Sequence, residues 1–163
     1  MKNIYLVRHA KAEPQDYNIS DFDRKLIDIG ILRSKKVFEK LKSKNPKIDL
    51  VISSSAIRTI MTTEIFIKTF KYDKKNVMYK KELYNSEIED IFEIFKEINN
   101  NVNNILLVGH NPAITNLAKL YSNNASIIMK TSDLVSVKIL TENWIDVNKS
   151  NTSFDFDIIA KEI

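Results

Sequence analysis

Three short and largely apolar runs, each ending abruptly at polar residues, constrain the fold more than any other feature of this sequence. They are residues 3–7, 48–52 and 105–108, and their character is typical of strands buried on both faces of a sheet. Segments with helical periodicity separate them. Because parallel strands need a crossover connection, usually a helix, this alternation predicts an α/β fold. We expect a three-layer sandwich with a largely parallel central sheet and helices on both faces.

The other elements follow from periodicity and capping residues. Helices are predicted over 27–44, 56–70, 86–98 and from Pro112 to Tyr121, and further strands over 76–79, 134–140 and 154–159. Ser53–Ser55 are interpreted as helix-capping residues, with a contribution of Ser53 to the site as the alternative, and Ser86–Glu89 has the spacing of a capping box. Apolar residues predicted to face the core from the first two helices are Ile31, Phe38, Leu41, Ile57, Ile60, Met61 and Ile65. Since no repeat or break in composition divides the chain, we expect a single domain over residues 1–163.

Composition excludes several classes of protein. The chain has no cysteine, which excludes disulfides, thiolate metal sites and cysteine nucleophiles. No apolar run approaches the roughly 20 residues that cross a bilayer, and the start lacks the apolar region of a signal peptide, so we expect a cytoplasmic protein without membrane contact. The net charge is +4, but the lysines are spread along the chain among acidic residues. Nucleic acid is therefore not an expected partner.

Histidine and arginine are scarce, which draws attention to where they occur. The only histidines are His9 and His110. There are 4 arginines among the 25 lysines and arginines, namely Arg8, Arg24, Arg33 and Arg58. Where lysine is the default cation, an arginine indicates a need for its planar, bidentate guanidinium.

Both histidines and two of these arginines follow predicted strands. Arg8 and His9 end the first apolar run, Arg58 follows the second and His110 follows the run at 105–108. Ligands of open α/β sheets bind at the carboxyl ends of the strands, where these residues converge. Guanidinium groups bind the oxygens of a phosphoryl group, and imidazole can attack phosphorus. Two histidines without an acidic cluster make a poor metal site, so we expect neither metal nor cofactor.

Three motifs then resemble those of a known family. Leu6–Ala10 (Leu-Val-Arg-His-Ala) resembles the first motif of the histidine phosphatase, or phosphoglycerate mutase-like, superfamily. Ser53–Thr59 with Thr62 resembles its second motif, and Val108–Pro112 (Val-Gly-His-Asn-Pro) its third. Within that superfamily, Tyr5–Glu13 is especially similar to the SixA-type phosphohistidine phosphatases.

The resemblance implies a metal-independent phosphatase that works in two steps. His9 would attack phosphorus and form a phosphohistidine intermediate, which water then hydrolyses. Arg8, Arg58 and His110 would bind the phosphoryl oxygens in both steps. Arg24 precedes a helix as in related phosphatases, so it either reaches the rim of the pocket or remains a solvated loop residue.

One element of the family pattern does not carry over. Larger members have a glutamate that protonates the leaving group, but here its position falls on Asn85, with Glu82 and Glu87 nearby. Phosphohistidine releases imidazole, a far better leaving group than an alkoxide, and so needs less help from an acid. The sequence therefore favours a phosphorylated histidine of a protein as substrate. The alternatives are a phosphatase of small phosphomonoesters and a non-catalytic module that binds phosphorylated groups. The sequence does not determine the oligomeric state.

Overall fold

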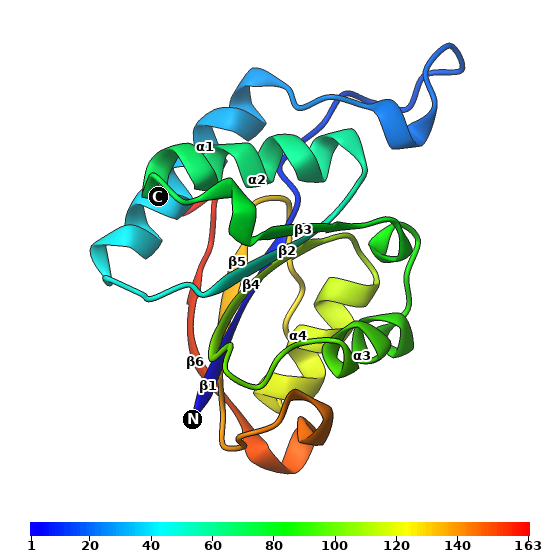
Figure 1. Cartoon of the computed structure of the whole chain (residues 1–163). Helices are drawn as coiled ribbons and strands as arrows, with labels where there is room; N and C mark the ends of the chain where they lie inside the picture. The colour runs from blue at the N-terminus through cyan, green and yellow to red at the C-terminus, as the bar shows by residue number, and fades with distance from the viewer.

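A computed structural model describes residues 1–163 and consists of one mixed sheet between two layers of helices (Figure 1). The strands are β1 (Lys2–Arg8), β2 (Leu50–Ser54), β3 (Val77–Lys80), β4 (Asn104–Gly109), β5 (Leu134–Ile139) and β6 (Thr152–Ile158). The helices are α1 (Asp28–Ser43), α2 (Ile57–Phe70), α3 (Ile88–Lys96) and α4 (Ala113–Ser122). Short 3-10 helices are η1 (Asp21–Asp23), η2 (Lys74–Asn76), η3 (Lys81–Leu83), η4 (Trp144–Asp146) and η5 (Lys149–Asn151). None of the helices is both long enough and apolar enough to cross a bilayer.

The sheet is mostly parallel, as the alternating pattern predicted. Its strand order is β3-β2-β4-β1-β5-β6. The pairs β3–β2, β2–β4 and β4–β1 are parallel, whereas β5 is antiparallel to both β1 and β6. The carboxyl ends of the adjacent parallel strands β2, β4 and β1 therefore lie side by side at the same end of the sheet.

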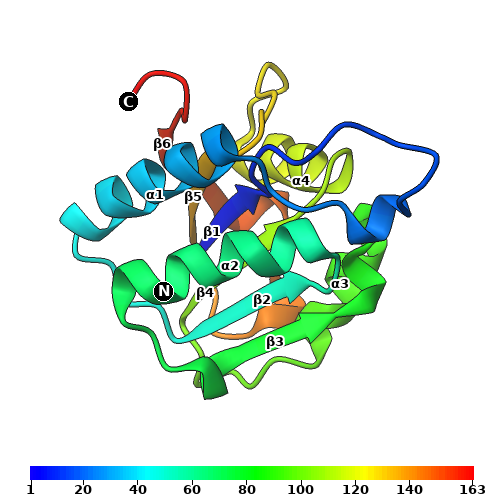
Figure 2. The same ribbon diagram turned by 90° about the horizontal axis from the view of Figure 1, so that it is seen from above.

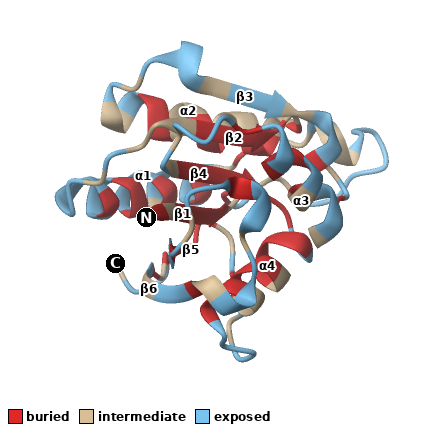
Figure 3. Cartoon of the chain, turned by 60° about the horizontal axis from the view of Figure 1, so that its bottom comes forward, coloured by how far each residue is buried: buried red, intermediate tan, exposed pale blue.

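The central strands divide the core into two parts because their side chains alternate between the two faces. Tyr5 and Val7 of β1 pack with α1 and α2, whereas Ile4 and Leu6 pack with α3 and α4. In Figure 3 the middle of the sheet is buried and the edge strand β3 is largely exposed. Helices thus cover both faces of the sheet, as predicted.

The predicted inward face of α2 is wrong in its first turns. Ile57, Ile60 and Met61 are only half-buried, as is Ile65 further along the helix, and the fully covered positions are Arg58, Thr59, Thr62 and Thr63. Thr59 and Thr62 face polar backbone near the strand ends rather than an apolar core. Thr59 Oγ1 donates to the carbonyl of Ser54 at 2.8 Å, and Thr62 Oγ1 accepts from the amide of Ala10 at 3.0 Å. Ile31 of α1, also predicted to face inward, is exposed.

The capping box of α3 lies one residue later than predicted. Glu87 and Asp90 exchange the two hydrogen bonds of the box, because the helix begins at Ile88. Ser86 instead donates to the carbonyl of Leu83 at 3.2 Å. Because the helix begins only at Ile88, the preceding Tyr84 and Asn85 lie in a turn.

A long loop after β1 leaves the body of the molecule and returns to it (Figure 1). Its two arms are joined by an antiparallel bridge between Ala12 and Leu26 and by a hydrogen bond of 3.1 Å from the amide of Ile27 to the carbonyl of Lys11. A Cβ atom on Gly30 would collide with that carbonyl, so only glycine fits at this approach of α1 to the loop.

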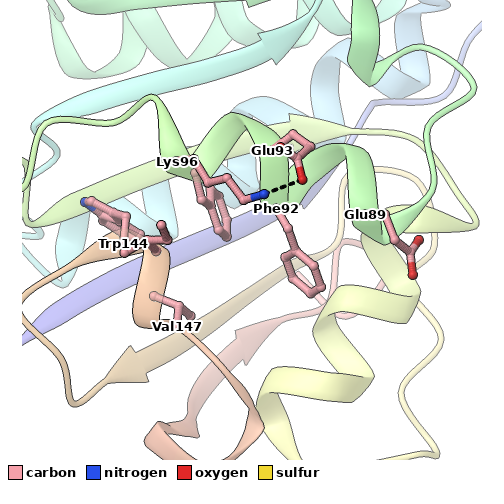
Figure 4. A pocket seen from close by; sticks show the side chains of 8 residues that line it. Glu89, Phe92, Glu93, Lys96, Trp144 and Val147 are labelled. Carbon is pink, nitrogen blue, oxygen red and sulfur yellow. Dashed lines mark hydrogen bonds and ion pairs between the residues drawn. The ribbon is translucent and has the colours of Figure 1, made fainter.

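A separate groove of about 290 Å³ lies between α3 and η4 (Figure 4). Phe92 and Trp144 contribute to its wall, and Lys96 pairs with Glu93 at its rim. The Nζ atom of Lys2, at the start of β1, lies 5.1 Å from the ring of Trp144. The groove is therefore at the amino-terminal end of β1, away from the polar residues that follow this strand.

Candidate active site

The polar residues predicted to form the site lie together at the carboxyl ends of the parallel strands. His9 follows β1, His110 follows β4, and Arg58 is in the first turn of α2. The imidazole centroids of His9 and His110 are 5.1 Å apart, and both side chains are buried. Arg58 is only 5% exposed, and Arg8 is half-buried at the end of β1. The structure thus brings all four residues to one place.

Strand pairing explains why the two histidines are neighbours. Arg8 pairs with Gly109 in the parallel register of β1 and β4, and the amide of His9 donates to the carbonyl of Gly109 at 3.0 Å. His9 and His110 are the next residues on their respective strands. Their proximity therefore follows from the backbone of the sheet rather than from side-chain packing.

The hydrogen bond of His9 determines which ring nitrogen is free to react. Nδ1 lies 2.8 Å from the carbonyl oxygen of Ala10, which can only accept, so Nδ1 carries the proton. Burial, together with the positive charges of Arg58 and Arg8, lowers the pKa of His9 to about 4. The ring is therefore neutral near pH 7, and Nε2 holds a lone pair that can attack an electrophile.

His110 is neutral for similar reasons and is oriented by Ser54. Burial first, then the neighbouring His9 and Arg58, lower the pKa of His110 to about 3. Its Nε2 lies 2.8 Å from Ser54 Oγ, which also accepts from the amide of Ala56 at 3.3 Å. The hydroxyl proton of Ser54 can be donated to Nε2, and His110 then carries its own proton on Nδ1. Ser53–Ser55 were predicted to cap the helix, but Ala56 precedes α2 and no side chain caps it. The contact of Ser54 with His110 was not predicted.

Three buried nitrogens of this cluster have no hydrogen-bond partner within the protein. They are Arg8 Nε, Arg58 Nε and His110 Nδ1. Buried donors without acceptors are costly, by about 1–3 kcal/mol each. Anionic oxygens, such as those of a phosphoryl group, are the acceptors that guanidinium and imidazole donors bind most strongly.

Asp21, on the loop after β1, holds the guanidinium of Arg58 in place. Arg58 donates from Nη1 to the Asp21 carbonyl at 2.5 Å and from Nη2 to the carboxylate at 3.0 Å. The same carboxylate accepts from the hydroxyl of Tyr84 at 2.7 Å and from Arg24 Nε at 2.9 Å. Although burial opposes ionisation, hydrogen bonds from Tyr84 and Arg24 and the charge of Arg58 lower the pKa of Asp21 to about 2.

Arg24 lies at the periphery of the cluster, with its guanidinium bound to other protein groups. Besides Asp21, it bonds from Nη1 to the carbonyl of Glu13 at 2.6 Å. Its positive charge contributes to the lowered pKa of His9. Arg24 therefore influences the site indirectly: it binds Asp21, which holds Arg58, and its positive charge helps to keep His9 neutral.

Tyr84 reaches the site from the turn that also holds Asn85, the position where the sequence resemblance would place an acid. Tyr84 meets the ring of His110 edge-on, with centroids 5.6 Å apart. Glu82, Asn85 and Glu87 are exposed and form no hydrogen bond with either histidine. Sequence reasoning missed Tyr84 and Asp21. The spacing of Asp21 and Arg24, which pair three residues apart, was the one local signal for either residue.

No three histidine, aspartate or glutamate side chains gather in a way that could hold a metal ion. The groups gathered here are guanidinium and imidazole nitrogens, and such donors suit an anion better than a cation.

Residues 4–101 match the family model of the histidine phosphatase superfamily (branch 1), a range that includes Arg8, His9 and Arg58 and ends before His110. An uncharacterised protein of Mycobacterium tuberculosis (strain H37Rv) is 27% identical over 153 residues, covering 86% of this chain and 91% of its own. Among solved structures, the protein histidine phosphatase SixA in complex with tungstate aligns with a TM-score of 0.82, 20% identity and 98% coverage of both chains. A provisionally assigned phosphohistidine phosphatase, SixA, from Agrobacterium tumefaciens aligns with a TM-score of 0.81, 22% identity and coverage of 96% and 97%. Both structures share the fold of this chain.

Proposed function

Because the chain belongs to branch 1 of the histidine phosphatase superfamily, we propose that it hydrolyses a phosphorylated histidine of a protein substrate. Members of this superfamily are generally phosphatases. The observation that carries the proposal is a neutral, buried His9 with a free Nε2, next to three buried donors that lack partners. Such an arrangement combines a nucleophile with a binding site for phosphoryl oxygens.

The reaction proceeds by two displacements at phosphorus. In the first, the lone pair of His9 Nε2 forms a bond to phosphorus while the bond to the substrate nitrogen breaks, and its electron pair leaves with the substrate imidazole. In the second, a water oxygen bonds to phosphorus, the bond to Nε2 breaks, and the water protons pass to phosphate and solvent. Arg8, Arg58 and His110 bind the phosphoryl oxygens throughout and stabilise their charge.

The environment of the pocket supports a phosphoramidate rather than an alkyl ester as substrate. Asp21 is ionised at neutral pH and holds no proton to donate. The hydroxyl of Tyr84 already donates its proton to Asp21 at 2.7 Å, and burial first and then this hydrogen bond raise the pKa of Tyr84. An alkoxide would leave without a proton donor, whereas a protonated phosphohistidine releases neutral imidazole.

The proposal is tested by comparing substrates. We expect kcat/KM for N-phosphoimidazole and a phosphohistidine peptide to exceed that for alkyl phosphates by about 100-fold or more, the scale of missing general acid catalysis. A preference for alkyl phosphates would instead favour the alternative, a phosphatase of small phosphomonoesters.

Two sets of variants separate the remaining alternatives. His9→Ala should abolish turnover and the acid-labile phosphoenzyme while the protein still binds inorganic phosphate or tungstate. Turnover that survives this change would show that His9 is not the nucleophile, and a wild-type protein that binds phosphate without turnover would be a binding module. Glu82→Gln and Glu87→Gln test whether either glutamate protonates the leaving group. Both side chains are exposed, so each variant should change kcat by less than about twofold.

A further inference from the structure

Arg33 is the one arginine that the proposed site does not use, yet the structure places it beside that site. It is half-buried on α1 and lines a groove of about 290 Å³ together with Arg8. We call this the basic groove. Its lining residues are Arg8, Lys11, Arg33, Lys130, Thr131 and Lys161. Figure 2 shows the elements that form it: the end of β1, the start of α1, the loop before β5 and the segment after β6.

The cations of the basic groove have no anionic partners in the chain. None of the nine ion pairs includes Lys11, Arg33, Lys130 or Lys161. No carboxylate lines the groove. Seven lysines elsewhere pair with acidic side chains and the others do not, so the distinguishing feature of this surface is that its unpaired cations gather around one hollow.

The carboxylate of Asp133, which lies below the segments that carry Lys130 and Lys161, is buried and already satisfied by hydrogen bonds. Its oxygens accept from the amides of Lys130 at 2.8 Å and Ala160 at 2.9 Å. Its negative charge stabilises the charged form of Arg8, which partly offsets the lowering of the Arg8 pKa by burial. Asp133 therefore connects the backbone of the two segments that carry Lys130 and Lys161, and its charge leaves most of the positive charge of the groove uncompensated.

The walls of the basic groove are also connected to the active-site strand. Ser34, the neighbour of Arg33, meets Ser132 with their hydroxyl oxygens 2.9 Å apart. The amide of Ser132 donates to the carbonyl of Arg8 at 3.1 Å. The positions from which these cations project are thus fixed relative to Arg8, although the lysine side chains themselves extend into solvent.

We propose that the basic groove binds an acidic segment of the protein substrate that flanks the phosphorylated residue. This inference rests on the proposed function, because Arg8 belongs both to the groove and to the phosphoryl site. Lys11, Lys130 and Lys161 are exposed and present separate charges, which suits several carboxylates spread along a chain. A second phosphate of a small molecule would be expected to need convergent, buried donors like those around His9.

Direct binding tests the inference without depending on catalysis. The probe is a fluorescein-labelled peptide with four glutamates beside an unmodified histidine, compared by anisotropy with a peptide that has glutamines instead. We expect the wild type to prefer the glutamate peptide. Arg33→Gln/Lys130→Gln/Lys161→Gln should weaken its binding by about tenfold, since each exposed charge pair contributes up to roughly 1 kcal/mol. The control Lys40→Gln/Lys68→Gln/Lys149→Gln removes as much charge from exposed positions outside the groove and should weaken binding by less than about twofold.

Each other outcome would overturn the inference. Equal binding of the two peptides would show that the groove does not recognise acidic residues, and equal weakening by both triple variants would show a general charge effect. Tighter binding of a single-stranded oligonucleotide of the same charge would indicate a nucleic-acid surface instead.

Turnover distinguishes this inference from the proposed function. A wild-type protein that hydrolyses neither N-phosphoimidazole nor a phosphohistidine peptide would overturn the phosphatase proposal, whatever the anisotropy shows. If hydrolysis occurs, the KM of a glutamate-flanked phosphohistidine peptide should be about tenfold higher in the groove variant than in the control variant. Equal KM values in the two variants would refute the groove alone.

Discussion

Replacing Asp21 by asparagine removes the carboxylate that pairs with Arg58 while keeping the size of the side chain. Arg58 then retains the Asp21 backbone carbonyl at 2.5 Å but loses the charged partner of its Nη2. The hydroxyl of Tyr84, which donates to the same oxygen at 2.7 Å, must meet an amide that is partly a donor itself. The substitution therefore tests whether Asp21 holds the phosphoryl-binding arginine in place.

The size of the effect follows from the pKa of Asp21, which folding lowers from 3.8 to about 2. At about 1.36 kcal/mol for each pKa unit, the folded state gains at most about 2.4 kcal/mol from ionising this carboxyl. The side chain is 34% exposed, so solvent screening reduces the expected loss in the variant to about 1–2 kcal/mol. Because the folded pKa is depressed, this stabilisation is present above pH 3.8 and disappears as the pH falls through about 2.

Urea denaturation at pH 7 measures the loss. With slopes of about 1–3 kcal/mol per molar urea, a loss of about 1–2 kcal/mol should lower the midpoint by about 0.3–2 M. Asp23→Asn is the control, since Asp23 is exposed and its carboxylate accepts only from Ser20, and it should cost less than about 0.5 kcal/mol. Equal losses in the two variants would refute the proposed role of Asp21, as would a difference from the wild type that is as large at pH 2 as at pH 7.

The remaining predictions concern protonation, the tyrosine and the glycine near the site. The pKa of His9 is about 4 and that of His110 about 3, so below pH 6.5 the unfolded chain binds protons that the folded chain does not, and the free energy of unfolding should fall as the pH drops from 6.5 to 4. Nuclear magnetic resonance of the two imidazoles should show both titrating below pH 5, and midpoints near 6.5 would contradict the structure. Tyr84→Phe keeps the ring against His110 but removes a hydroxyl donor; kcat should fall less than about fivefold, whereas a loss of 100-fold or more would identify Tyr84 as a proton donor. Gly30→Ala should destabilise the protein by about 1–3 kcal/mol in urea because its Cβ meets the carbonyl of Lys11, and an unchanged midpoint would mean that the loop and α1 can separate freely.

The central strands and the two histidines were predictable because their signals are local. Residues 3–7 and 105–108 are short, largely apolar runs typical of buried strands, and each is followed within two residues by a histidine. A parallel arrangement of such strands already implies that His9 and His110 approach each other.

The inward face of α2 and the roles of Asp21 and Tyr84 were not predictable in the same way. Hydrophobic periodicity assumes that a helix packs on an apolar core, but the first turns of α2 pack on polar strand ends, where Thr59 and Thr62 find backbone partners. Asp21 and Tyr84 lie in connections whose position depends on long-range contacts, such as the bridge that returns the loop after β1. No pattern within those segments specifies where they end up in space.

The register of β1 and β4 has a consequence for how such proteins diverge. Backbone hydrogen bonds between β1 and β4 determine the separation of His9 and His110. Exchanging one apolar residue for another within these strands therefore leaves that separation unchanged. Isoleucine, leucine and valine can therefore replace one another there as composition drifts, whereas an insertion or deletion in either strand would turn one imidazole to the opposite face. Two chains built in this way can differ at most positions while keeping one fold, and this chain shares its fold with the SixA structure at a TM-score of 0.82 and 20% identity.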